Sequence, residues 1–246
     1  SLENLAKDSF SSLKTILSAG SPLRLDVKEN ILNSMSENLF ELYGFSEGFA
    51  TMLKPHDQRK KFGSVGTPVL GFEIKIIDEK GNECSPNVAG EIAGYGAGMM
   101  KEYYSEVELT KNLIWTDNRG RSFIKSGDIG SLDEDGFLTI LDRKKDMIIS
   151  GGLNVFPVDI EEIVGKHPDV MDVTVIGVPH EKWGETCLAL IIPKNGVEVD
   201  CNEIKSWCNE RLAKHQRLNK VESRDEFPRN ALGKVLKRVL REPYWS

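Results

Sequence analysis

The stretch FLTILDRKKDMIISGGLN, residues 137–154, divides the chain into two parts that are built differently. Two short apolar runs, 137–141 and 147–149, flank five consecutive charged residues at 142–146. A strand, a charged connector and a strand that ends in two glycines do not fit inside one compact core, because burying an unpaired charge costs several kcal/mol. We therefore expect 142–146 to be exposed, at a surface, a domain boundary or a ligand.

The bulk composition is that of a soluble globular protein with one large or two ordinary domains: 246 residues, 39% hydrophobic and 28% charged. No apolar run is long enough to span a membrane, and the first residues, SLEN, do not resemble a signal peptide. The net charge of -6 argues against nucleic acid as the main partner. Four cysteines without a CxxC pair and four scattered histidines predict free thiols, no protein metal cage and a cytoplasmic location.

The residues before 63 have the pattern of the end of an α/β unit. Apolar spacing predicts helices over 5–18 and 25–37, and 40–44 reads as a short strand that meets a turn. A turn of small residues follows the first helix, and an aromatic turn follows the strand. In α/β units the ligands bind beyond the strand ends, where such turns lie.

From residue 63 the sequence changes to short strands, and after the charged connector it changes again. The middle third predicts a small antiparallel barrel or sandwich, and the last third predicts a separate small α+β domain. The expected strands are 71–78, 90–94, 122–125, 137–141, 170–178 and 186–192, and the expected helices are 103–111, one that begins at Pro157, 203–212 and a basic amphipathic stretch at 235–240. The expected domains are 1–62, 63–142 and 143–246.

Four short islands carry residue types that suit a nucleotide. They are Gly20-Ser21-Pro22, Tyr43-Gly44-Phe45-Ser46-Glu47, Ser126-Gly127-Asp128 and Gly233-Lys234. The first could line a planar base; the second could stack on a base, touch a phosphate and hold Mg²⁺; the third could accept two hydrogen bonds from a ribose diol. Each of these could instead be an ordinary capped turn. The fourth lacks the first glycine and the Ser/Thr of a Walker loop, so that motif is excluded and the alternative is a solvated lysine.

Taken together and in this order, the islands resemble the C-terminal half of the adenylate-forming superfamily, which includes acyl-CoA synthetases, adenylation domains of nonribosomal peptide synthetases and firefly luciferase. The matching stretches are YGFSE (43–47), GSVGTPVLGFEIKIID (63–78), GEI (90–92), KSGDIG (125–130), LDRKKDMIISGGLNVFPVDIE (141–161) and PRNALGK (228–234). The resemblance implies that ATP and a carboxylic acid form an acyl-adenylate and pyrophosphate, after which a thiol, usually of coenzyme A, displaces AMP. It also implies the end of an α/β subdomain, a β-barrel subdomain and a mobile C-terminal α+β lid.

The same resemblance implies roles for individual residues. On the nucleotide it assigns the backbone of Gly20, Ser21 and Pro22 to adenine, Tyr43 with Gly44 to the stacked aromatic motif, and Asp128 and Arg143 to the ribose. In the chemistry it assigns Ser46 to the α-phosphate, Glu47 to Mg²⁺, and Lys234 to the gap between the attacking carboxylate and the α-phosphate. Lys145 aligns with the hinge and Gly152 with the loop along which the thiol arm passes, where glycine permits a close approach.

The chain also departs from the family pattern. Ser46 and Ser126 stand where threonine is commoner, but both keep the hydroxyl. The Ser/Thr/Gly-rich phosphate loop and most of the acyl pocket are not found in these residues, so we expect the N-terminal half to be missing and the 246 residues alone to be inactive. The stretches DRKKDMIISGGLNVFP (142–157), HPDV (167–170) and VIGVPHEKWGE (175–185) resemble medium-chain or aromatic acyl-CoA synthetases more than peptide synthetase domains. The alternatives are a stand-alone adenylation protein that loads a carrier protein, or a non-catalytic half-subunit that pairs with a separate N-terminal half.

Overall fold

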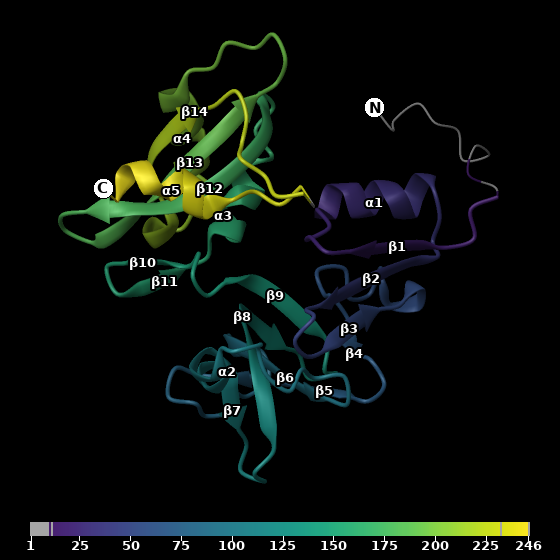
Figure 1. Ribbon diagram of the computed structural model, residues 1–246. Coiled ribbons are helices and arrows are strands. Elements are labelled where there is room, and N and C mark those ends of the chain that lie inside the picture. Colours follow the sequence, from purple (N-terminus) through teal and green to yellow (C-terminus); the bar gives the residue numbers. More distant parts are fainter. Residues whose placement is uncertain (1–9, 11, 232, 246) are drawn as a thin grey trace. The chain divides into compact units, whose positions relative to one another are not determined.

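The computed structural model describes residues 10, 12–231 and 233–245 (Figure 1). The chain divides into two compact units between Ile140 and Leu141, inside strand β9. The described residues form three sheets, two in the N-terminal unit and one in the C-terminal unit. The fold is therefore mixed α/β. No helix among these residues has both the length and the apolar character that a membrane crossing needs.

The first sheet has four strands in the order β1-β2-β3-β4, in which β1 is parallel to β2 and the other pairs are antiparallel. Its elements are β1 (Ile16–Ala19), α1 (Leu25–Ser34), β2 (Leu39–Gly44), β3 (Ala50–Leu53), η3 (Pro55–Asp57) and β4 (Thr67–Pro68). The helix predicted over 5–18 is wrong where it can be compared, since Ile16–Ala19 is a strand; residues 5–9 and 11 lie outside the described residues. Pairing of Ile16 with Leu39, far along the chain, overrides the local helical spacing.

Helix α1 lies beside the first sheet (Figure 1), and a buried ion pair fixes it there. The Lys28 side chain is 1% exposed, and its Nζ lies 2.6 Å from Oε1 of Glu41 on β2. Lys28 Nζ also donates to the carbonyl of Phe62 at 2.6 Å. One side chain thus ties the helix, the sheet and the segment before β4 together.

The second sheet is antiparallel, in the order β5-β6-β8-β7 with β9 paired to β8. Its elements are β5 (Phe72–Ile77), β6 (Gly90–Gly96), α2 (Val107–Leu113), β7 (Ile114–Thr116), β8 (Ser122–Leu132) and β9 (Leu138–Arg143). The expected strands lie here, but two expectations are wrong. The helix begins at Val107 rather than at Tyr103, and β8 continues through a bulge to Leu132 instead of ending at Lys125.

The C-terminal unit is built on the sheet β11-β10-β13-β12, with β14 paired to β13. Its elements are β10 (Ile148–Ser150), β11 (Leu153–Val155), α3 (Pro157–Val164), β12 (Val170–His180), β13 (Gly184–Pro193), α4 (Cys201–Asn209), η4 (Lys214–Gln216), β14 (Leu218–Ser223), α5 (Lys237–Arg241) and η5 (Glu242–Tyr244). Side chains of α3 and α4 pack on one face of the sheet. A separate apolar cluster contains Ile176 of β12 and Leu188 of β13. Phe227, Leu240 and Tyr244 from the C-terminal segment pack in this cluster.

The end of the chain is anchored to strand β14 through Glu222. Its Oε2 accepts hydrogen bonds from Tyr244 Oη at 2.6 Å and from Arg224 Nη2 at 2.7 Å, and Lys220 Nζ lies 2.7 Å from Oε1. Burial by itself would raise the pKa of Glu222, but these three partners outweigh it and lower the pKa to about 2. The carboxylate is therefore more stable in the folded protein than in the unfolded chain.

This shift predicts an acid-dependent loss of stability. Because the folded pKa lies below the unfolded one, the stabilisation is complete above the unfolded value near 4.5 and is lost as the pH falls toward 2. Between pH 7 and pH 3 the loss should be about 2 kcal/mol. Urea unfolding at both pH values should show this loss in the wild type but not in Glu222→Gln, and an equal pH dependence in the two proteins would contradict it.

Candidate active site

Two predicted islands lie at one edge of the first sheet. Because β1 and β2 are parallel, their carboxyl ends point to the same edge. Gly20-Ser21-Pro22 follows the end of β1, and Phe45-Ser46-Glu47 follows the end of β2. Gly20 has φ +87°, a conformation that side chains other than that of glycine rarely adopt. The sequence thus builds two turns side by side at the edge of the sheet where α/β folds bind ligands.

The structure joins a third island to this edge. Tyr43 Oη donates a hydrogen bond of 2.7 Å to Oδ2 of Asp128, which is 85 residues away in sequence. The sequence pattern predicts that Asp128 follows a strand that ends at Lys125. In the structure it lies instead in the bulge inside β8, where Gly127 has φ +72°. The Ser126 hydroxyl donates to the Ile92 carbonyl at 2.9 Å and accepts from the Asp128 amide at 3.0 Å. The bulge and this hydroxyl therefore position the Asp128 carboxylate beside Tyr43.

The ring of Tyr43 is held by a tight hairpin between β2 and β3. Tyr43 packs edge-to-face on Phe49, with ring centroids 5.9 Å apart, and Phe45 packs on the same ring at 4.9 Å. A Cβ atom on Gly44 would lie only 2.4 Å from the Phe49 carbonyl oxygen. Gly44 is thus required for the close approach of the two strands, which orients the neighbouring Tyr43.

Glu47 is fixed at the same hairpin by two contacts that the sequence did not indicate. Tyr103 Oη donates to Glu47 Oε1 at 2.6 Å, and the Met100 amide donates to the Glu47 carbonyl at 2.8 Å. The hydrogen bond to Glu47 raises the pKa of the Tyr103 hydroxyl. Ser46, between Tyr43 and Glu47, is exposed. No local pattern marks Tyr103, because its partner is 56 residues away.

The donor set at Glu47 suits a magnesium ion that arrives with a nucleotide. Mg²⁺ in nucleotide enzymes is usually held by one or two carboxylates together with the substrate phosphates. Within residues 10, 12–231 and 233–245, no group of three His, Cys, Asp or Glu side chains could hold a metal by itself. A single oriented carboxylate therefore fits a nucleotide-borne Mg²⁺ and does not fit an all-protein cage.

The remaining predicted site residues are Arg143, Lys145, Gly152 and Lys234, and all four belong to the C-terminal unit. Arg143 and Lys145 lie in the charged connector. Arg143 ends β9, and its carbonyl accepts hydrogen bonds from the amides of Asp146 at 2.9 Å and Met147 at 3.0 Å, which closes a turn around the exposed Lys145. Asp142 Oδ2 accepts a hydrogen bond of 3.3 Å from the Val158 amide in the first turn of helix α3. Burial raises the pKa of the Asp142 carboxyl, and the nearby Lys237 opposes that shift.

The expectation that all five connector charges are exposed is wrong for Asp146. Asp146 is only 8% exposed and is therefore buried. Arg241, on α5, lies 3.4 Å from Asp146 Oδ1 and compensates the buried charge. The rule that an unpaired charge is not buried still holds, but the partner is 95 residues further along the chain and was not visible in the local pattern.

Gly151 and Gly152 form the two-residue turn between β10 and β11. Their φ values are +59° and +79°, and Ser150 pairs with Leu153, as in a type I′ hairpin. A Cβ on Gly151 would lie 2.9 Å from Cε3 of Trp183, whereas a Cβ on Gly152 would meet no atom within 4 Å. The first glycine is thus needed for packing as well as for its φ, and the second leaves its side of the turn open.

Lys234 lies beside a short antiparallel bridge near the end of the chain. Arg229 and Val235 form an isolated antiparallel bridge, and the Asn230 side chain accepts a hydrogen bond from the Lys234 amide at 2.9 Å. The Asn230 amide donates to the Lys234 carbonyl at the same distance. The backbone at Lys234 is therefore well fixed within the C-terminal unit.

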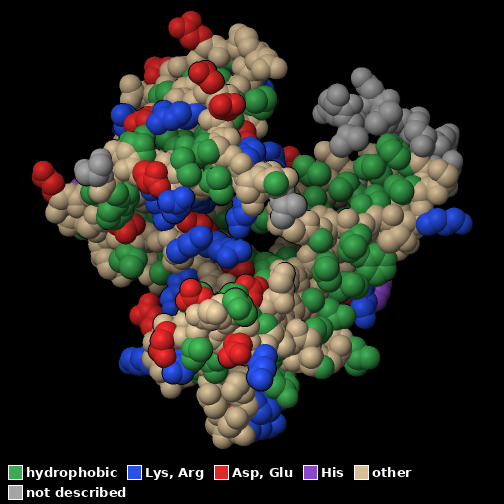
Figure 2. Space-filling view, viewed as in Figure 1, with side chains coloured by type: hydrophobic (Ala, Val, Ile, Leu, Met, Phe, Trp, Pro, Cys, Tyr) green, Lys and Arg blue, Asp and Glu red, His purple; other side chains and the backbone are tan. Residues whose placement is uncertain are grey.

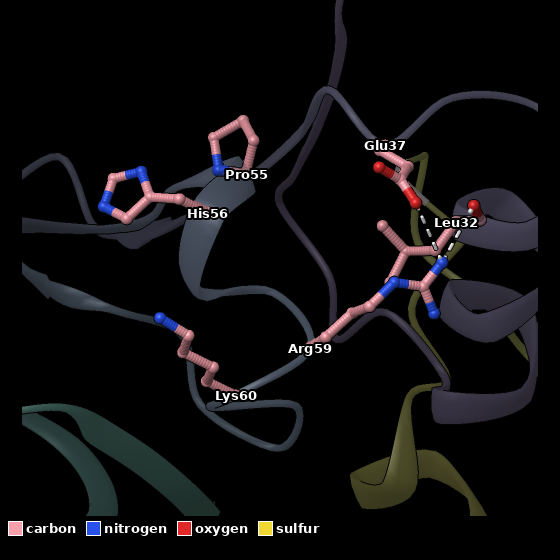
Figure 3. A pocket seen from close by; sticks show the side chains of 6 residues that line it. All are labelled: Leu32, Glu37, Pro55, His56, Arg59 and Lys60. Atoms are coloured by element: carbon pink, nitrogen blue, oxygen red, sulfur yellow. Dashed lines mark hydrogen bonds and ion pairs between the residues drawn. The ribbon is translucent and has the colours of Figure 1, made fainter.

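The N-terminal unit also contains a hollow of about 310 Å³ that holds none of the predicted site residues (Figure 3). It is lined by Leu32, Glu37, Pro55, His56, Arg59 and Lys60. Arg59 crosses it to donate to the Leu32 carbonyl and to Glu37 Oε1, both at 3.3 Å. These contacts connect α1 with the segment after η3, so we read the hollow as a structural junction.

Two family models match the chain. The model described as AMP-binding enzyme matches residues 1–104, and the model described as AMP-binding enzyme C-terminal domain matches residues 159–234.

Several known proteins are similar to most of the chain. A long-chain-fatty-acid–CoA ligase of Salmonella typhimurium is 35% identical over 95% of the chain, and a 2-succinylbenzoate–CoA ligase of Geobacillus kaustophilus is 40% identical over 82%. The chain spans 41% of the length of each of these relatives. Among solved structures, ATP-bound MatB of Rhodopseudomonas palustris matches with a TM-score of 0.90 and 32% identity, over 99% of this chain and 48% of that one.

A second solved structure is that of o-succinylbenzoate CoA synthetase of Bacillus subtilis in complex with its acyl-adenylate intermediate. It matches with a TM-score of 0.82 and 35% identity, over 94% of this chain and 46% of that one.

Proposed function

We propose, since this chain belongs to the adenylate-forming superfamily of AMP-binding enzymes, that it is the C-terminal portion of an ATP-dependent acid–CoA ligase. In the first step a carboxylate oxygen attacks the α-phosphorus of ATP, which forms an acyl-adenylate and releases pyrophosphate. In the second step the thiol of coenzyme A attacks the acyl carbon, which forms a thioester and releases AMP.

The observation that carries this proposal is the hydrogen bond between Tyr43 and Asp128 at the edge where β1 and β2 end. An aromatic ring and a nearly buried carboxylate, 6% exposed, stand side by side there. Such a pair suits an adenosine, because the ring can stack on the base while the carboxylate accepts hydrogen bonds from the ribose hydroxyls. The turn at Gly20-Ser21-Pro22 would line the adenine, and Ser46 and Glu47 would face the phosphates and their Mg²⁺.

The C-terminal unit would supply the groups for the two steps in turn. Lys234 would hold the attacking carboxylate and the α-phosphate together, because a cation offsets the repulsion between two anions that must meet. Arg143 would reach the ribose. Rotation at Lys145 would then replace Lys234 by the Gly152 turn, past which the thiol arm of coenzyme A would enter. The open side of Gly152, where no atom lies within 4 Å of an added Cβ, supports this passage.

Coenzyme A is favoured as the acceptor over the phosphopantetheine of a carrier protein. The relatives above are named as CoA ligases for long-chain fatty acids and 2-succinylbenzoate. Because the chain spans less than half the length of these relatives, we propose that activity needs the N-terminal half of the same enzyme, and the tests of activity below use the full-length protein.

The ribose contact gives a direct test. In the full-length enzyme, Asp128→Ala should raise the KM for ATP about 10- to 100-fold, because it removes charge-assisted hydrogen bonds. The wild type should discriminate against 2′- and 3′-deoxy-ATP by a similar factor, and the variant should treat all three nucleotides alike. Pyrophosphate release with each nucleotide measures this. Asp135→Ala, which removes an exposed carboxylate of the β8–β9 turn, is the control. A variant that still prefers ATP would contradict the assignment.

A further inference from the structure

Arg241, the last residue of α5, reaches back to the turn around Lys145. Its Nη1 donates to the Lys145 carbonyl at 2.8 Å and its Nη2 donates to the Asp146 carbonyl at 3.0 Å. The side chain is 21% exposed, so these bonds are partly shielded from water. The planar fork of a guanidinium suits two adjacent carbonyls better than a single ammonium does. Arg241 therefore clamps two successive peptide groups of the turn.

The segment that bears Arg241 also bears Lys234, and it is anchored to the same sheet. Val235, Leu240 and Tyr244 pack against the apolar cluster formed by Ile176, Leu188, Leu190 and Phe227. Lys237 Nζ lies 2.8 Å from Glu161 Oε1 on α3. In Figure 2 basic side chains gather over the part of the C-terminal unit that holds α5. Lys234 and Arg241 thus belong to one packed segment.

The bonds of the turn fall into two classes relative to Lys145. The amides of Asp146 and Met147 donate to the Arg143 carbonyl, so these bonds cross Lys145 and must break if the backbone rotates there. The bonds from Arg241 end on the carbonyls of Lys145 and Asp146, which lie beyond both rotatable backbone bonds of Lys145. Rotation at Lys145 would leave them intact.

We propose that Arg241 is a positioning residue that couples the hinge turn to the segment of Lys234, so that rotation at Lys145 carries Lys234 as part of one rigid body. This inference rests on the proposed function. The Gly152 turn depends on Arg241 less, because strand β10 follows the hinge turn directly in the chain and pairs with β11 and with Gly184 of β13. Loss of Arg241 should therefore impair the Lys234-dependent step more than the thiol-dependent step.

The clamp itself can be tested on the 246-residue chain by hydrogen exchange, without any activity. In Arg241→Ala the amides of Asp146 and Met147 should exchange about 10-fold faster or more, since two bonds that hold the turn are lost. Arg241→Lys should be intermediate. The matched control is Arg238→Ala, on the same helix, whose side chain is 83% exposed and pairs with Glu242. Unchanged exchange at the two amides, or an equal rise throughout β12–β14, would overturn the clamp.

The coupling is tested by the two half-reactions of the full-length enzyme. Arg241→Ala should lower kcat for adenylation about 10-fold with the KM for ATP within about 2-fold, and thiolation of a supplied acyl-adenylate should stay within about 2-fold. Arg241→Lys should recover part of the loss, and Arg238→Ala should change neither step. An equal loss in both steps, or no loss, would overturn the coupling. A wild type that performs neither half-reaction would refute the proposed function, whereas the exchange result would still decide the clamp.

Discussion

Lys234→Ala in the full-length enzyme should lower the rate of ATP–pyrophosphate exchange by about 10²- to 10³-fold. A preorganised cation beside a developing charge contributes about 3–4 kcal/mol to transition-state stabilisation in comparable sites. The backbone around Lys234 is fixed by the Arg229–Val235 bridge and by Asn230, so the truncation removes the charge and leaves these backbone contacts in place. Thiolation of a supplied acyl-adenylate should remain within about 3-fold of the wild type.

The contrast between the two half-reactions separates a chemical role from a structural one. Lys214→Ala, at an exposed lysine of η4 in the same unit, is the control and should leave both steps unchanged. If Lys234→Ala reduced both half-reactions equally, Lys234 would be supporting the unit rather than adenylation, and its assignment would be wrong.

Lys28→Met should be the most destabilising single substitution that we predict. It removes one partner of a buried ion pair and leaves Glu41, which is 7% exposed, without its charge partner inside the first sheet. Breaking such a pair costs about 3–5 kcal/mol, mostly because the remaining charge stays desolvated. It also removes the donor to the Phe62 carbonyl. Urea unfolding followed by circular dichroism measures the change in the free energy of unfolding.

A second substitution tests the cause. Lys28→Met combined with Glu41→Leu should return to within about 1 kcal/mol of the wild type, because an apolar pair can replace a buried ion pair at similar volume. Lys80→Met, at an exposed lysine in the turn after β5, should cost less than about 0.5 kcal/mol. A double variant as unstable as Lys28→Met alone would show that the ion pair is not the reason.

The sequence was most informative where the structure depends on local chemistry. Helix α3 begins at Pro157, as expected, because the fixed φ of proline suits a first helical position. The strands of the second sheet alternate apolar and polar residues as an antiparallel sheet requires. In each case the deciding interactions lie within a few residues.

The misses have a common cause in contacts between distant residues. Ile16–Ala19 is a strand because residues 39–42 pair with it, and the local apolar spacing alone suggested a helix. Asp146 is buried because Arg241 reaches it. Neither partner could be found from the residues around the site.

The candidate site, too, was predicted only in part. The islands were recognised from their residues and order, but their arrangement was not. The bond between Tyr43 and Asp128 joins positions 85 residues apart, and it depends on a bulge that the sequence pattern did not show. The contacts of Tyr103 with Glu47 and of Arg241 with the hinge turn have no local signature at all.

The stoichiometry of products from the full-length enzyme tests the proposed function most directly. With ATP, Mg²⁺, coenzyme A and a panel of carboxylic acids, at least one acid should yield AMP, pyrophosphate and acyl-CoA in equal amounts. Without coenzyme A, the same acid should yield pyrophosphate and an enzyme-bound acyl-adenylate. Formation of ADP and phosphate instead, or thioester formation without AMP, would contradict an acyl-adenylate mechanism for the enzyme that contains this chain.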